Sequence, residues 1–330
     1  MLETAVREVT VLAAGGTIGM TPAGDGGGVV PRLDAEALVK AVPPLAAVPA
    51  LRARTISTRP SVQLTAAEAL DIARAAAAEA EAGRGVVVTH GTDTLEEVAL
   101  LCDLLYAGEA PIVFTGAMRH ASALGADGPA NLFDAVVVAG AAGAEGLGVL
   151  IVFAGAVHAA RAVRKADSTA PAAFDSPRLG PIGRVQEGRA WMARRLERFP
   201  PVPVASLDAT VHIVPAALGA DGSLLDAALE AGADGLVGVV LGAGHTPPPY
   251  LASLKRAAAR VPVVITVRPE RGSILRGTYA FEGAELDLRT GPLICAAALS
   301  PAAARIKLLA CLGAGYARGA IAGAFGPDDF

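Results

Sequence analysis

Aromatic side chains are scarce in this chain of 330 residues, because Phe, Trp and Tyr together make up only 4% of it. A hydrophobic fraction of 53% therefore depends on Ala, Val, Leu and Ile. Parallel strands that helices cover on both faces are rich in such aliphatic residues. The composition therefore favours an α/β fold with an aliphatic core.

The chain also lacks a strong excess of charge of either sign, and it lacks long apolar runs. The formal net charge is -4, and no basic block is interleaved with aromatic residues, so nucleic acid is not an expected partner. The longest apolar runs, such as residues 135–144, fall short of the roughly 20 residues that span a bilayer. Residues 1–8 are charged where a signal peptide requires an apolar region. We expect a cytoplasmic protein without a membrane partner.

Cysteine is rare as well, and its spacing excludes the common metal sites. Cys102, Cys295 and Cys311 lie far apart, with no CxxC or Cys/His pattern typical of zinc or redox centres. Each is expected to pack as a small apolar residue, which agrees with a reducing compartment. No metal and no cofactor is expected.

The first half of the chain alternates between expected strands and helices. We expect a helix from residue 66, because Thr65 and Glu68 have the spacing of a capping box and Gly83 follows an Ala-rich run. Alternation of this kind predicts a doubly wound parallel sheet. The remaining expected elements are strands at 9–14, 51–56, 86–89, 111–114 and 148–153, and helices at 34–42, 95–106 and 128–138.

Prolines separate this region from a second set of strands and helices. Residues 196–208 hold three prolines without apolar periodicity, which is typical of a linker. We therefore expect an N-terminal catalytic α/β domain over 1–195, a linker over 196–209 and a smaller α/β C-terminal domain over 210–330. Two further segments look irregular: a Gly-rich loop over 20–30, which could act as a lid, and residues 157–188.

One motif places a hydroxyl where α/β folds bind ligands. The apolar run that begins at Val9 ends in Gly15-Gly16, and Thr17 follows directly. In open α/β sheets, ligands bind at the carboxyl ends of the strands. Taken alone, this pattern is more typical of an ordinary turn between a strand and a helix.

A second strand also ends in a threonine, in the stretch from Gly85 to Glu97 that contains Thr92-Asp93. Asp93 with Glu96, and Thr94 with Glu97, also have capping-box spacing. A helix start and an anion site are compatible, because a helix N-terminus attracts negative charge. His90, in the same turn, is expected to be a hydrogen-bonded turn histidine without a catalytic role.

Together these stretches resemble the two signature motifs of the bacterial-type L-asparaginase (asparaginase/glutaminase) family, and the resemblance covers nearly the whole chain. It implies that Thr17 is the nucleophile, next to Gly16 in the substrate site. It also implies that Thr92 orients or activates water or substrate, and that Asp93 holds the substrate α-ammonium. Lys165, in a segment similar to the one that carries the family's lysine, would complete a Thr–Lys–Asp triad. A lone lysine is usually solvated, so this role rests on the resemblance.

Other positions that match the family concern substrate binding or the bracing of loops. By resemblance, Ser61 holds the α-carboxylate, and His245 stands where the family has an asparagine that reaches a neighbouring subunit. Val62 replaces a glutamine that helps to hold the α-ammonium, with Gln63 one position later, and residues 20–30 lack the family's lid tyrosine. Residues expected to brace the loops are Arg119, Asp127 and Asn131.

The resemblance implies hydrolysis of L-asparagine to L-aspartate and ammonia by a homotetramer built as a dimer of dimers. Glutamine or another small amide is the alternative substrate. The departures from the family pattern leave open a catalytically weak amino-acid-binding protein. The amidase subunit of a tRNA-dependent amidotransferase is disfavoured, because that subunit normally has an extra N-terminal domain.

Overall fold

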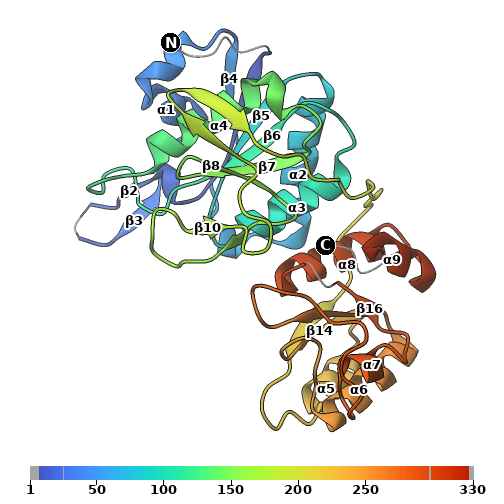
Figure 1. Ribbon diagram of the computed structural model, residues 1–330. Coiled ribbons are helices and arrows are strands. Elements are labelled where there is room, and N and C mark those ends of the chain that lie inside the picture. The colour runs from blue at the N-terminus through green and yellow to red at the C-terminus, as the bar shows by residue number, and fades with distance from the viewer. Residues whose placement is uncertain (1–6, 25, 297–298, 327–330) are drawn as a thin grey trace. The chain divides into compact units, whose positions relative to one another are not determined.

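The computed structural model describes residues 7–24, 26–296 and 299–326, which fall into two compact units divided after Pro201 (Figure 1). Residues 1–8, whose charges argue against a signal peptide, lie mostly outside the described residues. None of the helices in the described parts of the chain is both long and apolar enough to cross a membrane.

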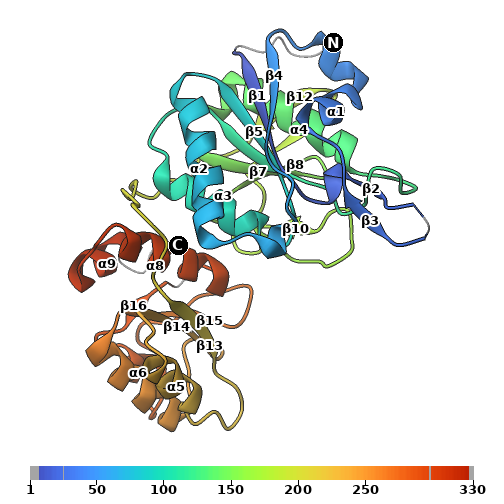
Figure 2. The same cartoon turned by 180° about the vertical axis from the view of Figure 1, so that it is seen from behind.

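The first unit is built on an eight-stranded sheet in the order β12-β11-β8-β7-β6-β5-β1-β4. Its parallel part confirms the predicted alternation, since helices pack on both faces of the sheet (Figures 1 and 2). The parallel strands are β1 (Val9–Ala14), β4 (Leu51–Ser57), β5 (Gly85–His90), β6 (Ile112–Thr115) and β7 (Val149–Phe153). The helices are α1 (Ala35–Lys40), α2 (Ala66–Glu81), α3 (Leu95–Leu105) and α4 (Gly128–Gly140).

Helix α2 begins as the sequence predicts. The Glu68 amide donates to Thr65 Oγ1 at 3.2 Å, and the Thr65 amide donates to Glu68 Oε2 at 2.8 Å. Gly83 has φ 82°, the left-handed conformation that a glycine after a helix end adopts readily. The reciprocal hydrogen bonds fix the start of the helix that crosses from β4 to β5.

Two segments expected to be irregular contain strands. Residues 20–30 hold most of an antiparallel hairpin of β2 (Met20–Pro22) and β3 (Val29–Pro31), with residue 25 outside the described set. The segment 157–188 holds most of β8 (Ala156–Ala159), together with β9 (Arg164–Lys165), β10 (Phe174–Asp175) and β11 (Gly183–Gln186). These strands span only two to four residues, too few for alternation to be recognised in the sequence.

Three of the short strands extend the sheet in a mixed arrangement. β8 runs antiparallel to β7, β11 to β8, and β12 (Arg189–Met192) to β11. β9 and β10 instead form a separate two-stranded ladder. The N-terminal sheet is therefore mixed and mostly parallel rather than parallel throughout.

The second unit has a four-stranded parallel sheet in chain order. Ser300 caps α8 by accepting a hydrogen bond from the Ala303 amide at 3.1 Å. Residues 193–210, all of them described, contain neither helix nor strand. The strands are β13 (Val211–Pro215), β14 (Gly235–Val240), β15 (Val263–Val267) and β16 (Ile294–Cys295), and the helices are α5 (Ser223–Glu230), α6 (Pro248–Arg260), α7 (Glu285–Leu288), α8 (Pro301–Gly313) and α9 (Arg318–Phe325).

His158 in β8 makes the stability of the first unit depend on pH. Its buried Nδ1 lies 2.9 Å from Ser176 Oγ, and burial lowers the pKa of the imidazole from 6.5 to about 4, against the opposing charge of Asp175. The stabilisation from neutral His158 is complete above pH 6.5 and is lost as the pH falls towards 4, because only the unfolded chain binds the proton in this range.

We therefore expect the wild-type protein to lose about 2 kcal/mol of unfolding free energy between pH 7 and pH 5 that His158→Gln does not lose. Urea unfolding of both proteins at the two pH values measures the difference. Equal losses in the two proteins would contradict the assigned pKa of His158.

Candidate functional site

The site forms where β1 and β5 end side by side. Their last residues, Ala14 and His90, are partners in the parallel register. β4 pairs with the other side of β1, and β6 with the other side of β5, so the chain leaves the two strands in opposite directions. Such a switch point is where open α/β sheets bind ligands. As predicted, Thr17 and Thr92 follow these two strands at one edge of the sheet.

Glycines let the loops after these strands come together backbone to backbone. Gly16 has φ 95°, and a Cβ there would lie 2.6 Å from the Gly91 nitrogen. A Cβ on Gly91 would in turn lie 2.5 Å from Ser61 Oγ. The backbone therefore forms the floor of the site, and Thr17 opens a 3₁₀ turn directly after Gly16.

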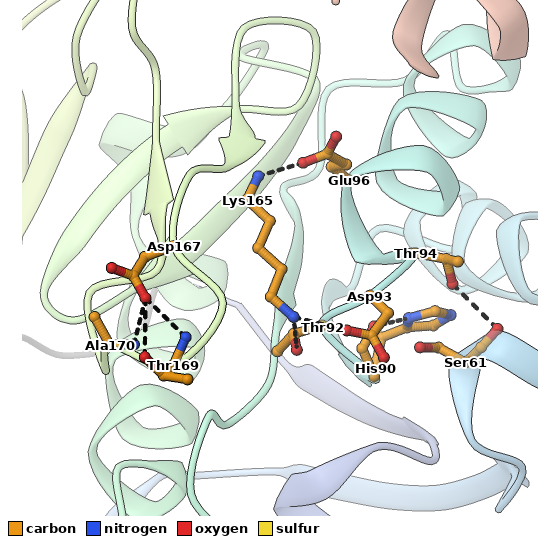
Figure 3. A network of polar contacts seen from close by, with 11 residues as sticks. Ser61, His90, Thr92, Asp93, Thr94, Glu96, Lys165, Asp167, Thr169 and Ala170 are labelled. Carbon is orange, nitrogen blue, oxygen red and sulfur yellow. Dashed lines mark hydrogen bonds and ion pairs between the residues drawn. The ribbon is translucent and has the colours of Figure 1, made fainter. Parts of the chain in front are cut away.

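Lys165 joins the loop after β5 from a distant part of the chain. Its Nζ donates to Thr92 Oγ1 at 3.0 Å and lies 2.7 Å from Asp93 Oδ1 (Figure 3). Only 19% of the Lys165 side chain is exposed. Lys165 therefore differs from most lysines, whose side chains are solvated. Its backbone N–H donates to the carboxylate of Glu96.

These residues surround one pocket of about 200 Å³. Six of the seven predicted site residues line it, and four more side chains were not foreseen by the sequence reasoning. The predicted residues in the lining are Gly16, Thr17, Ser61, Thr92, Asp93 and Lys165; the others are Met20, Pro60, Met118 and Ser168, together with Gly91.

The wall that carries Met118 is held by the residues predicted to brace it. Asp127 accepts hydrogen bonds from the amides of Met118 and Arg119 at 2.9 and 2.8 Å. Asn131 Nδ2 donates to Gly116 O at 3.0 Å. Met118 directly precedes Arg119, one of the residues expected to brace the loops, so the sequence held a signal next to this side chain.

The helix start after Asp93 differs from the capping-box expectation. Thr94 is the N-cap of α3, but its side chain makes no capping hydrogen bond; its Oγ1 donates to Ser61 O at 3.3 Å. Asp93 and Glu96, which have the spacing of a box, both bind Lys165 instead. The capping-box interpretation is therefore wrong at both spacings.

His90 is buried at the end of β5, just before the turn in which it was expected. Its Nδ1 lies 2.9 Å from Gly91 O, and burial lowers its pKa to about 4. A neutral imidazole that is closed off from the pocket supports the loop rather than taking part in proton transfer. Within the described residues, no group of three or more His, Cys, Asp or Glu could hold a metal ion.

His245 is the one predicted site residue that does not line the pocket. It lies in the second unit, where its Nε2 is 3.7 Å from the buried Glu285 Oε2. Its ring packs 5.0 Å from Tyr279 and 5.2 Å from Phe281, measured between centroids. Its place in substrate binding remains a prediction.

Comparisons with known proteins cover both units. The family model "Asparaginase, N-terminal" matches residues 8–198, and "Glutaminase/Asparaginase C-terminal domain" matches 210–325. A probable L-asparaginase of Deinococcus radiodurans is 36% identical over 329 residues, covering 96% of each chain. A probable periplasmic L-asparaginase of Haemophilus influenzae is 34% identical, covering 91% of this chain and 87% of the relative. The crystal structure of a probable cytoplasmic L-asparaginase from Campylobacter jejuni superposes with a TM-score of 0.84 at 28% identity, covering 97% and 99% of the two chains.

Proposed function

Because the chain belongs to the asparaginase/glutaminase family by both of its domains, we propose that it hydrolyses L-asparagine to L-aspartate and ammonia. One observation carries this proposal: Lys165 Nζ lies between Thr92 Oγ1 and Asp93 Oδ1 in the pocket that Thr17 lines. An amide hydrolase needs a hydroxyl nucleophile and a group that moves its proton, and the pocket supplies both kinds of side chain.

The proposed reaction has two steps. Thr17 Oγ attacks the side-chain carbonyl carbon, the C–N bond breaks, and the proton from the hydroxyl leaves with the nitrogen as ammonia. Water then attacks the threonine ester, releasing aspartate and returning a proton to Thr17 Oγ. In both steps Lys165, through Thr92, takes the proton from the attacking oxygen and passes it to the leaving group, which is the amide nitrogen in the first step and Thr17 Oγ in the second. Backbone N–H groups beside Gly16 and Thr17 hold the developing oxyanion.

Substrate orientation follows from the polar groups at the other end of the pocket. Asp93 is the carboxylate for the α-ammonium, and Ser61, with Gly16, holds the α-carboxylate. Support comes from the position of all three in the pocket lining. Glutamine is the second candidate substrate, because the matched C-terminal family is described as glutaminase as well as asparaginase.

Val62 lowers the expected affinity for asparagine. It is 67% exposed and outside the pocket lining, although it follows Ser61 directly. A missing partner for a charged group costs about 1.5–3 kcal/mol, which is roughly one to two powers of ten in affinity. We expect a millimolar KM for L-asparagine, lowered roughly ten- to a hundredfold in Val62→Gln with kcat unchanged.

Gln63 provides the rival explanation, since a shift of this turn by one residue would bring its amide to the substrate. Steady-state kinetics of Gln63→Ala separates the two accounts. A micromolar KM in the wild type that is lost in Gln63→Ala would contradict the assignment of Val62.

We also propose an oligomeric state and a cellular compartment for the protein. The family resemblance supports a homotetramer, a dimer of dimers in which His245 serves a neighbouring subunit's pocket; light scattering would then give the mass of four chains. A cytoplasmic location is supported by Cys102, Cys295 and Cys311, which form no disulfide within the described residues. Relatives named as cytoplasmic and as periplasmic both exist.

Ammonia release from L-asparagine, L-glutamine and succinamate by the purified protein tests the proposal. Release from asparagine that exceeds release from glutamine supports asparaginase activity, and the reverse order supports glutaminase activity. If no amide is cleaved while aspartate raises the melting temperature, the protein binds amino acids without hydrolysing them, and the proposal fails.

A further inference from the structure

Lys165 lies on a short strand that is not part of the eight-stranded sheet. β9, which contains Lys165, pairs only with β10, in the register Phe174–Lys165 and Asp175–Arg164. Thr92 and Asp93, in contrast, follow directly from the buried strand β5. The lysine Nζ must therefore be brought to the pocket by contacts between two separate pieces of structure.

Glu96 supplies one of these contacts from the first turn of α3. Its Oε2 accepts a hydrogen bond from the backbone N–H of Lys165, at the opposite end of the residue from the Nζ contacts (Figure 3). Asp93 and Glu96 are three positions apart, a spacing at which side chains meet on one face of a helical turn. The start of α3 therefore holds Lys165 at both its backbone and its Nζ.

The carboxylate of Glu96 is suited to a fixed contact. It is largely withdrawn from water, and this burial raises its pKa, while the hydrogen bond from Lys165 and the charge of Arg164 act in the opposite direction. A hydrogen bond to a charged group is typically shorter and stronger than a neutral one. Loss of the side chain would leave the partly buried Lys165 N–H without this acceptor.

We propose that Glu96 is a positioning residue for the amide hydrolysis: by holding the Lys165 backbone, it keeps Nζ between Thr92 and Asp93. A lysine side chain has large conformational freedom, so the ammonium end is placed accurately only if its backbone is fixed. Misplacement of a catalytic group by about 1 Å can cost about 10²-fold in rate. The inference rests on the proposed function.

Kinetics of three substitutions tests the role. Glu96→Ala removes the acceptor and should lower kcat about 10- to 100-fold while KM changes less than about threefold. Glu96→Gln retains an acceptor oxygen of the same reach and should restore kcat to within about fivefold of wild type. Glu96→Asp keeps the charge but has a shorter side chain, so its kcat should be as low as that of Glu96→Ala. Aspartate also favours the first turn of a helix, so this variant keeps the test possible if the alanine variant does not fold.

Glu97 provides the control for these substitutions, and three results would contradict the role of Glu96. Glu97→Ala removes the adjacent carboxylate of the same turn and should keep kcat. Wild-type kcat in Glu96→Asp, or a Glu96→Gln variant as slow as Glu96→Ala, would overturn the proposal. So would a rise in KM alone, because that result makes Glu96 a binding residue.

A readout without substrate separates this inference from the proposed function. Acetic anhydride acetylates free lysine amines, and mass spectrometry follows the rates at Lys165 and at the exposed Lys40. Glu96→Ala should raise the rate at Lys165 several-fold and leave Lys40 unchanged, whereas Glu96→Gln should not. If wild-type protein cleaves no amide but labelling changes as expected, the function fails and the positioning role stands. If the protein is active and neither labelling nor kcat responds to Glu96→Ala, the positioning role fails alone.

Discussion

We expect Thr17→Val to lower kcat for amide hydrolysis by at least about 10³-fold, the size of loss that follows removal of a nucleophile. Valine replaces the hydroxyl by a methyl group and keeps the β-branched shape, so the 3₁₀ turn Thr17–Gly19 and the pocket lining should stay in place. Ammonia release and the melting temperature, measured on the same preparations, separate lost chemistry from lost folding.

Thr21→Val is the matched control for this substitution. Thr21 is a partly buried residue of β2, four positions further along, and it is outside the pocket lining. The same chemical change there should leave kcat near the wild-type value. Turnover of Thr17→Val within tenfold of wild type would rule out Thr17 as the nucleophile.

Lys165→Met has the second largest expected effect, a loss of about 10²–10⁴-fold in kcat, the usual contribution of a positioned acid or base. The thioether keeps the length of the apolar stem but neither donates to Thr92 nor pairs with Asp93. Substrate is held by other residues in the proposal, so KM should change far less than kcat. Steady-state kinetics with asparagine gives both numbers.

The second unit offers a control with the same local contacts. Lys255 Nζ lies 2.6 Å from Asp287 Oδ1 and donates to Thr290 Oγ1 at 3.2 Å, which is the arrangement of Lys165 with Asp93 and Thr92. Lys255→Met therefore breaks an equivalent ion pair outside the pocket lining and should affect stability more than rate. A rise in KM alone for Lys165→Met would make that lysine a binding residue and remove it from the triad.

Features encoded within a few residues could be predicted from the sequence. Thr65 and Glu68 define the start of α2 by their own hydrogen bonds, and the run from Val9 is buried along its whole length. The position of each threonine after a strand also followed from the sequence, at the strand ends where open α/β sheets bind ligands. Local signals were therefore sufficient for the parallel sheet and for the threonine side of the pocket.

Contacts between distant residues could not be predicted in the same way. Lys165 and Glu96 are 69 positions apart, and the spacing of Asp93 and Glu96 suits equally a helix cap and two carboxylates on one face. The presence of Lys165 nearby decides between these roles, and no periodicity in the sequence reports it. The same holds for β8, whose four residues become a strand only by pairing with β7 and β11.

The backbone floor of the pocket limits how the site can be redesigned. A methyl group at position 16 or 91 would meet neighbouring backbone or the Ser61 side chain within 2.6 Å, so these positions are closed to every amino acid except glycine. Met20, Met118 and Ser168 enter the same space with exchangeable side chains. Directed evolution towards bulkier or smaller amides should collect its productive changes at these three positions, while the glycine floor stays invariant across the selected variants.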